Sequence, residues 1–191
     1  MTTIAFDGRI MAADSQMSGV SQNLKILKIF PFATPNMRGI VGGCGEAAYL
    51  PEQFAWIMQD GGPNNRVPRE LELLVITQQK RRRKPLAHMV EVSGHYVPVP
   101  LQYAIGSGGP YAQGAMAQGA NAIEAVKVAS GLDIGTGNSI FAYDFKTQDW
   151  VQRPPDDTIY RLTYLVDMFL APENTINPQP ETDHNDDADS D

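Results

Sequence analysis

A strand predicted almost at the first residue is the feature that most constrains how this chain folds. Residues 3–6 have the composition of a strand, Asp7 and Gly8 form a hairpin turn signal, and residues 9–13 return as a second strand. Closing the hairpin at Asp7 and Gly8 would place Thr2 roughly opposite Ala13–Asp14. Because chain termini normally fray, few folds hold a terminus inside a sheet beside a carboxylate.

The first two residues, Met1 and Thr2, have a chemical consequence. An initiator methionine is readily removed when a small residue follows, and removal would leave a hydroxyl and a free α-amine on Thr2. An α-amine titrates near pH ~8, so part of it is neutral at physiological pH and can accept a proton. A threonine at the start of a chain therefore carries its own nucleophile and its own base. Met-Thr starts are common, so this pair alone does not establish catalysis.

Size and composition indicate one globular domain with a real core, since the chain has 191 residues and 42% are hydrophobic. Nothing resembles a secretory leader or an apolar span of about 18 residues, which predicts a soluble, cytoplasmic protein without membrane contact. The single Cys44 excludes an internal disulfide. With only three histidines, no metal-ligand pattern arises, and we expect neither a metal nor another cofactor.

The negative charge is concentrated at the C-terminus. Seven of the 22 acidic residues lie in the last 21 positions, which contain no lysine or arginine, so the other 170 residues carry 15 acids against 15 bases. The composition predicts a folded domain over residues 1–170 and a disordered, solvated acidic tail over residues 171–191.

The order of the predicted elements points to a layered α+β domain with mostly antiparallel sheets, because strands come in consecutive runs with helices between and after them. Further strands are predicted at residues 24–30, 37–45, 70–77, 86–92, 95–99, 101–105, 139–144 and 149–152, and helices at 46–58, 110–119, 121–129 and 158–170.

Five consecutive basic residues, 80–84, could form a nucleic-acid patch. No aromatic residues are interleaved with them and the rest of the domain is neutral, which favours a solvated hairpin tip over a nucleic-acid site.

Glycine-rich segments follow several of the predicted strands. Residues 42–45 (GGCG) lie between a strand and a helix, where backbone N–H groups can approach and polarise an oxyanion. Such a segment is also a common tight connection between a strand and a helix. Residues 106–109 and 131–138 are further polar glycine loops, and the absence of a GK[ST] sequence argues against a nucleotide P-loop.

Several of these blocks together resemble the bacterial proteasome-like peptidase HslV and, more broadly, the proteasome β-subunits, which are N-terminal-nucleophile hydrolases. The matching blocks are TTIAFDGRIMAADSQMS, KIF, GIVGGCGEA and AIGSGGPYAQGA, with a weaker match at SGLDIGTGN. The resemblance implies a four-layer αββα sandwich, a homo-oligomeric ring, and hydrolysis of peptides or unfolded proteins by a processed N-terminal threonine. The short architecture is similar to a compact phage-borne or stand-alone branch of that family.

The resemblance also implies roles for individual residues. Thr2 would be the nucleophile, with its α-amine as the base, and Asp14 would match the acid beside it. Lys28 would match the family's buried lysine, whose charge disfavours an ammonium on the nearby amine. Gly42 would supply the oxyanion N–H. The remaining polar shell would consist of Ser107 in the catalytic group and of Asp133 and Thr136 in support.

Departures from the family leave alternatives open. Lys25 competes with Lys28 for the active-site position, since strand parity does not separate them. The segment between Met58 and Glu70 is too short for the family's second long helix, and the C-terminus is longer and more acidic; both bear on ring assembly and on docking of an ATPase unfoldase. Two other functions fit the same blocks: an amidohydrolase acting on a small amide, and a non-catalytic ring or scaffold subunit.

Overall fold

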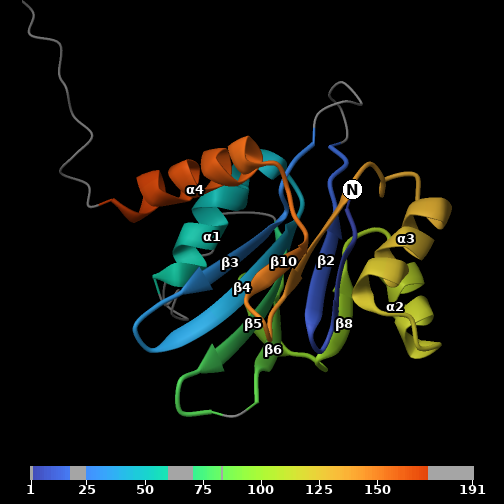
Figure 1. The fold of residues 1–191 in the computed structure, drawn as a ribbon, viewed down its shortest axis with the longest axis horizontal. Coiled ribbons are helices and arrows are strands. Elements are labelled where there is room, and N and C mark those ends of the chain that lie inside the picture. The colour runs from blue at the N-terminus through green and yellow to red at the C-terminus, as the bar shows by residue number, and fades with distance from the viewer. Residues whose placement is uncertain (1, 18–24, 60–70, 83, 172–191) are drawn as a thin grey trace, which may run out of the picture.

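The computed structural model describes residues 2–17, 25–59, 71–82 and 84–171. Within them the chain forms two five-stranded antiparallel sheets and four α-helices (Figure 1). The helices lie on the outer faces of the two sheets, two on each side. The predicted α+β four-layer αββα sandwich is therefore confirmed.

The first sheet contains the N-terminal hairpin at its centre. Its strands follow the order β10-β9-β2-β1-β8, and every neighbouring pair is antiparallel. The bounds are β1 Ile4–Asp7, β2 Ile10–Asp14, β8 Gln102–Ile105, β9 Ile140–Asp144 and β10 Asp149–Gln152. Because β1 pairs on both sides, the residues before it are held within the sheet instead of fraying.

The second sheet is a simple meander in chain order, β3-β4-β5-β6-β7, also antiparallel throughout. The bounds are β3 Ile29–Ala33, β4 Met37–Cys44, β5 Glu72–Gln79, β6 Leu86–Val90 and β7 Tyr96–Pro98. The basic residues 80–82 and 84 fall in the β5–β6 connection, at the predicted hairpin tip.

Two pairs of helices complete the sandwich. Helices α2 (Gly109–Ala117) and α3 (Ala122–Leu132) pack on the first sheet, and α1 (Leu50–Met58) with α4 (Asp156–Leu170) lies on the side of the second (Figure 1). Helix α3 begins with a capping box, in which Asn121 and Glu124 exchange hydrogen bonds of 3.0 Å.

Alternation along β1 separates two hydrophobic layers. Ile4 and Phe6 point into the main core between the sheets, where Ile29 and Ile40 of the second sheet also lie. Ala5 points to the other face and belongs to a separate cluster of small residues beneath α2 and α3. Small side chains let these helices approach the first sheet closely.

The N-terminal hairpin closes one residue later than predicted. The two loop residues are Gly8 and Arg9, because the Asp7 carboxylate accepts hydrogen bonds from the Arg9 and Ile10 N–H groups at 2.9 and 2.8 Å. Gly8 occupies a positive φ of 97°, which suits the first loop position of such a hairpin. Ile4 therefore pairs with Ala13, which aligns Thr3, not Thr2, with Asp14.

Two helices differ from expectation. The predicted helix over residues 46–58 starts as a short 3₁₀ turn, Ala47–Tyr49, before α1 begins at Leu50. Helix α4 begins at Asp156, and its buried residues are Leu162 and Val166. Leu165 and Phe169 of the same helix are 42% and 50% exposed.

The predicted acidic tail lies outside the described residues from position 172 onward, as do residues 60–70 of the segment after Met58. In the part of the chain that the structure describes, no helix is both long and apolar enough to cross a bilayer.

Candidate active site

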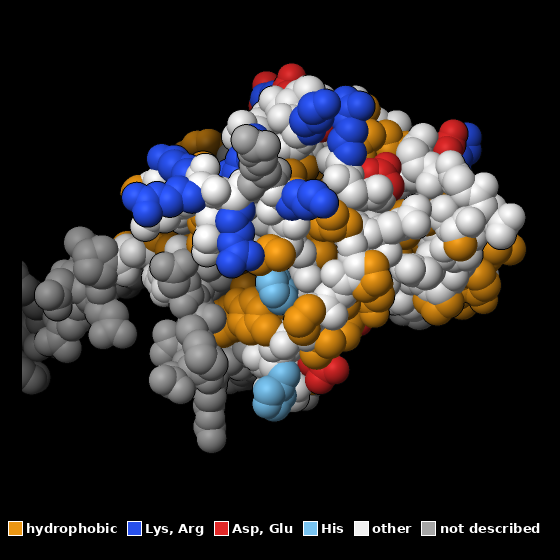
Figure 2. Space-filling view, turned by 90° about the horizontal axis from the view of Figure 1, so that it is seen from below, with side chains coloured by type: hydrophobic (Ala, Val, Ile, Leu, Met, Phe, Trp, Pro, Cys, Tyr) orange, Lys and Arg blue, Asp and Glu red, His pale blue; other side chains and the backbone are white. Residues whose placement is uncertain are grey.

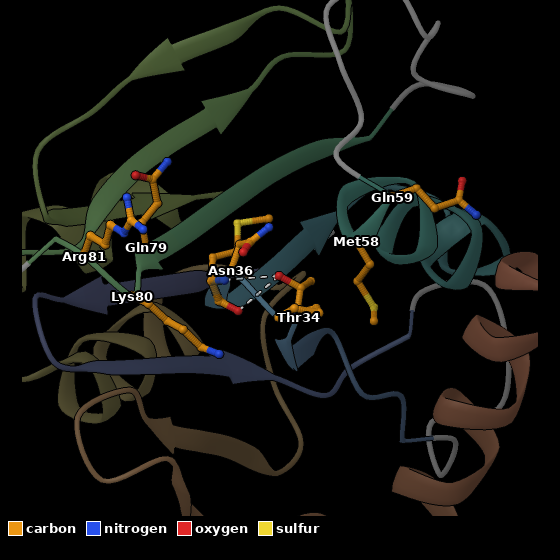
Figure 3. Close-up of a pocket in the computed structure, with 9 residues that line it drawn as sticks. Thr34, Asn36, Met58, Gln59, Gln79, Lys80 and Arg81 are labelled. Atoms are coloured by element: carbon orange, nitrogen blue, oxygen red, sulfur yellow. Dashed lines mark hydrogen bonds between the residues drawn. The ribbon is translucent and has the colours of Figure 1, made fainter.

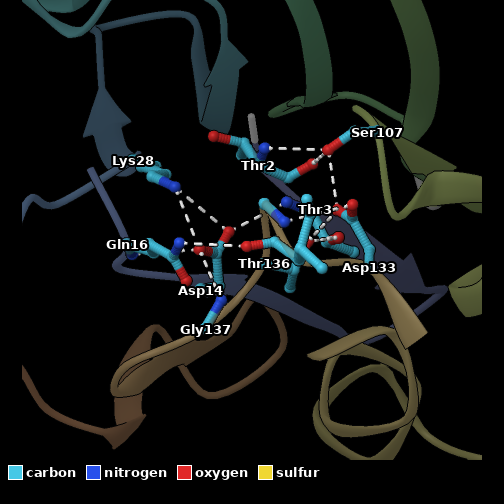
Figure 4. Close-up of polar contacts among 11 residues, drawn as sticks. Thr2, Thr3, Asp14, Gln16, Lys28, Ser107, Asp133, Thr136 and Gly137 are labelled. Atoms are coloured by element: carbon cyan, nitrogen blue, oxygen red, sulfur yellow. Dashed lines mark hydrogen bonds and ion pairs between the residues drawn. The ribbon is translucent and has the colours of Figure 1, made fainter. Parts of the chain in front are cut away.

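A buried ion pair lies beside the N-terminal strand. Lys28, just before β3, places its Nζ 3.1 Å from both carboxylate oxygens of Asp14 at the end of β2. The Asp14 side chain is completely buried and that of Lys28 is 4% exposed. The two sheets thus each contribute one charge, and the pair joins them at the edge where the chain starts (Figure 4).

Backbone donors complete the surroundings of Asp14. Its Oδ1 accepts the Thr3 N–H at 2.8 Å, and its Oδ2 accepts the N–H groups of Gln16 at 2.9 Å and Gly137 at 3.2 Å. A buried carboxylate with a cation and three N–H partners is fully compensated. Burial lowers the pKa of the Lys28 ammonium, and the Asp14 charge opposes that shift.

The structure separates the two candidate lysines. Lys25 is exposed, and its backbone forms an isolated bridge to Gln16. Lys28 is buried and reaches Asp14. Of the two, only Lys28 therefore lies in the polar cluster around the chain start.

A second polar chain runs along the other side of Thr2. The Thr2 N–H donates to Ser107 Oγ at 3.3 Å, and Ser107 Oγ donates to Asp133 Oδ2 at 2.7 Å. The same Asp133 oxygen accepts from Thr136 Oγ1 at 2.6 Å, and the Thr136 and Thr3 hydroxyls lie 2.6 Å apart. Figure 4 shows Lys28 and Asp14 on one side of Thr2, with Ser107 and Asp133 on the other.

Asp133 anchors this chain of hydroxyls. It follows α3 directly, and the bonds from Thr136, Ser107 and the Gly135 N–H lower the pKa of its carboxyl group against the opposing effect of burial. The ionised Asp133 accepts a hydrogen bond from the Ser107 hydroxyl, so the Ser107 oxygen can accept a hydrogen bond from the Thr2 N–H. Two loops thus bring together Ser107, which was predicted in the catalytic group, and the two predicted supporting residues, Asp133 and Thr136.

Two glycines after β8 allow this close approach. A side chain on Gly106, which has a positive φ of 90°, would collide with the Thr2 carbonyl oxygen. One on Gly108 would collide with Thr3 Oγ1 and lie 2.8 Å from Thr136 Oγ1. Because these two positions have no side chain, the loop can lie directly against the N-terminal strand.

A small pocket opens beside Thr2, with a volume of about 210 Å³. Its polar lining includes Lys28, and its backbone lining includes Gly43 and Gly45. Gly42, predicted to supply an oxyanion donor, does not line it. Gly42 lies inside the ladder between Ile29 and Leu74, with its missing side chain facing Ile4.

The other glycines suit the oxyanion position differently. The Gly43 N–H already donates to the Lys28 carbonyl oxygen at 3.0 Å. Gly45 follows the end of β4 and has a positive φ of 134°, so its backbone leaves the ladder at the pocket. The three glycines at 42–45 are visible in the sequence. Which of them leaves the strand and lines the pocket depends on where β4 ends.

An apolar groove of about 400 Å³ adjoins the small pocket. The two share the residues Met17, Ile26, Ala47 and Leu50. The far side of the groove is formed by α4 through Leu162 and Leu165, with the cationic residues Lys25 and Arg161 in its lining. An extended chain lying across Thr2 could place an apolar side chain there.

Chemically, the site offers a hydroxyl at the chain start, a buried cation, an ionised carboxylate linked to the Thr2 nitrogen through a serine, and backbone N–H groups. This is the set that acyl transfer by a nucleophile requires. Sequence reasoning missed Thr3, whose N–H binds Asp14 and whose hydroxyl binds Thr136. The position of Thr3 next to Thr2, at the start of the predicted strand, is the sequence feature that could have indicated this role.

Comparison with solved structures finds the same fold in Anbu proteins. A Gly-1 mutant of Anbu from Hyphomicrobium sp. strain MC1 matches with a TM-score of 0.63 and 14% identity, covering 88% of this chain and 93% of that one. Anbu, described as an ancestral beta-subunit, from Yersinia bercovieri matches with a TM-score of 0.61, 10% identity and the same coverage. At these identities the likeness shows the fold alone.

These matches correct the predicted resemblance. Anbu is proteasome-like but distinct from HslV, so the specific likeness to HslV is wrong, although the N-terminal-nucleophile-type sandwich holds. No family model matches the chain. A search of curated proteins also finds no match. The short blocks that suggested HslV lie mostly at the chain start and in the glycine loops.

Proposed function

We propose that this protein is a threonine-type peptidase, an N-terminal-nucleophile hydrolase in which removal of Met1 exposes Thr2. The observation that carries the proposal is the pocket in which Thr2 and Lys28 lie together, because Lys28 is held there by the buried Asp14. A fold shared with proteasome-like structures supports it.

The reaction begins with proton transfer within one residue. The neutral α-amine of Thr2 accepts the hydroxyl proton as Oγ1 attacks the carbonyl carbon of a peptide bond. The resulting tetrahedral intermediate collapses when the ammonium returns the proton to the leaving amine, which breaks the C–N bond and leaves an ester on Oγ1. A water molecule, deprotonated by the same amine, then hydrolyses the ester and restores the hydroxyl.

The groups around Thr2 would assist these steps. The positive charge of Lys28 disfavours an ammonium next to it and so keeps the amine available as a base, and it stabilises negative charge developing on the Thr2 oxygen. Ser107 and Asp133 orient the nitrogen through the hydrogen bonds already present. The backbone N–H of Gly45, which lines the pocket, would donate to the oxyanion.

The shape of the site favours a peptide over a small amide. The apolar groove continues from the Thr2 pocket as far as α4, which is more space than the acyl group of a small amide needs. A peptide would occupy it with a hydrophobic side chain next to the cleaved bond.

A hydrolysis assay on unstructured peptides, with the wild type, Thr2→Ser and Thr2→Ala, tests the proposal. We expect Thr2→Ser to retain activity, because it keeps a hydroxyl and an amine, and Thr2→Ala to abolish it. Peptide cleavage that survives Thr2→Ala in a clean preparation would overturn the proposal. Turnover of small amides without turnover of peptides would instead establish the small-amide alternative.

A further inference from the structure

A basic cavity lies at the opposite end of the second sheet from Thr2. Its volume is about 1030 Å³, and it is bounded by the β3–β4 turn, the end of α1 and the β5–β6 tip. Figure 3 shows Met58 and Gln59 on one side of it and Lys80 and Arg81 on the other, with Thr34 between them. It shares no lining residue with the Thr2 pocket.

The cations at this end lack acidic partners. Lys80, Arg81, Arg82 and Lys84 are all exposed, and in the described part of the chain none of them forms an ion pair. Nearby Arg38 binds the Gln78 amide oxygen at 3.0 and 2.6 Å, so its charge is also not neutralised by an acid. Figure 2 looks onto this end of the molecule and shows basic side chains gathered there.

The acidic C-terminal segment leaves the fold next to this cavity. Gln59, which lines the cavity, donates its side-chain N–H to the carbonyl oxygen of Phe169 at 3.4 Å, one residue before α4 ends. Glu173 follows four residues later and Glu181 twelve residues later. Extended chain covers about 3.3 Å per residue, so these acids can reach about 13 Å and 40 Å from Phe169.

Charge selects between the two segments that could fill the cavity. Residues 60–70 directly follow Gln59, but they carry two acids and two arginines and so have no net charge. Residues 172–191 carry seven acids and no lysine or arginine. Of the two, only this acidic tail complements the four unpaired cations.

We propose that the acidic tail, residues 172–191, binds back onto its own chain at the basic cavity. Its carboxylates pair there with Lys80 and Arg81 of the lining and with Arg82 and Lys84 of the adjoining β5–β6 connection. The cavity is thereby an acidic-peptide site whose ligand is tethered. Tethering raises the effective concentration of the tail to the millimolar range, so weak individual ion pairs suffice. The proposal does not depend on the chemistry at Thr2.

Zero-length crosslinking of the full-length protein tests this contact. A carbodiimide joins a carboxylate to a lysine amine with loss of water, and peptide mass spectrometry identifies both ends. At low salt we expect crosslinks from tail acids to Lys80 and Lys84 at least about fivefold above those to Lys127 and Lys146, which are equally exposed elsewhere. Raising the salt to about 0.5 M should remove most of this excess by screening.

A matched pair of charge variants sharpens the test. Lys80→Glu, Arg81→Glu and Arg82→Glu together should reduce crosslinking at Lys84 to the background level. The control, Lys25→Glu, Lys127→Glu and Lys146→Glu together, makes the same change in net charge and should leave crosslinking at Lys84 unchanged. Circular dichroism verifies that both variants are folded.

Three results would overturn the proposal. Equal crosslinking at all exposed lysines would show no preference for the cavity. Crosslinks that join ¹⁴N to ¹⁵N chains in a mixed sample would assign the tail to a second copy. If an oligonucleotide binds the full chain as tightly as a variant with all seven tail acids neutralised, the basic residues are open to nucleic acid and the tail does not occupy them.

Discussion

Two polar clusters flank the start of the chain, and they differ in burial. Asp14 and Lys28 form an ion pair that is almost entirely excluded from water. On the other side, Ser107 is exposed and Asp133 half-buried, and their partners are hydroxyls and a backbone N–H. Both clusters converge on Thr2 and Thr3.

This difference in burial predicts that the first cluster stabilises the fold around Thr2, whereas the second contributes little to stability. A buried charge without its partner costs several kcal/mol, so the pair fixes the junction of the two sheets as well as the local field. An exposed network is screened by water and contributes little to folding. Changes in its contact with the Thr2 nitrogen should therefore have a small effect on stability.

The largest expected effect is on the buried pair. Asp14→Asn leaves Lys28 buried without an acid, and we expect it to lower the free energy of unfolding by about 3–5 kcal/mol. Urea denaturation followed by circular dichroism measures this. As a control, Arg153→Met breaks the exposed Arg153–Asp156 pair of 2.8 Å and should cost less than about 1 kcal/mol. Equal losses would remove the distinction between the clusters.

Next in size is the packing between the clusters. Gly108→Ala introduces a methyl group against Thr3 Oγ1 and should lower the free energy of unfolding by about 1–3 kcal/mol. Gly114→Ala in α2 is the matched control, because nothing lies within 4 Å of the added methyl group. That variant should be more stable than the wild type by about 0.5–1 kcal/mol. A neutral Gly108→Ala would mean that the loop is not held against Thr3.

The exposed cluster should affect activity more than stability. Ser107→Ala removes the link between the Thr2 nitrogen and Asp133, and we expect peptidase activity to fall about tenfold to a hundredfold with the melting temperature nearly unchanged. The control is Ser130→Ala, whose hydroxyl only donates to the Lys127 carbonyl oxygen on the α3 surface. A large loss of stability in Ser107→Ala would place this serine in the structural cluster instead.

The smallest effect concerns pH. The pKa of Asp133 is lowered in the folded protein, so its contribution to stability is present above its unfolded value, about 3.9, and disappears as the pH falls through the folded value. Asp133→Asn should therefore flatten the decline of the melting temperature below about pH 4. The corresponding change in the free energy of unfolding is less than about 1 kcal/mol, because the group is partly exposed. Parallel curves for the two proteins would contradict this.

Local patterns allowed much of the fold to be predicted from sequence. Alternation and turn signals predicted the strands and the layered class, and the helix predicted at residues 121–129 corresponds to α3. What failed were matters of register. Asp7 binds two backbone N–H groups and shifts the turn to Gly8 and Arg9, which moves every partner in the hairpin.

In the candidate site, too, local patterns identified the residue types but not their positions. The residue types near Thr2 were recognisable, but the choice between Lys25 and Lys28 depended on which one the fold buries against Asp14. The choice among the glycines at 42–45 depended on where β4 ends. Neither burial nor the end of a ladder is set by local sequence, since both depend on contacts with distant strands.

The measurement that tests the central claim most directly is the intact mass of the purified protein before and after reaction with an electrophile directed at an N-terminal threonine. We predict that the chain lacks Met1 and gains one adduct, and that Thr2→Ala gains none. A chain that retains Met1 and gains no adduct would contradict the claim, because the Thr2 nitrogen would then be an amide and could not serve as a base. The protein would in that case be a non-catalytic subunit with the same fold.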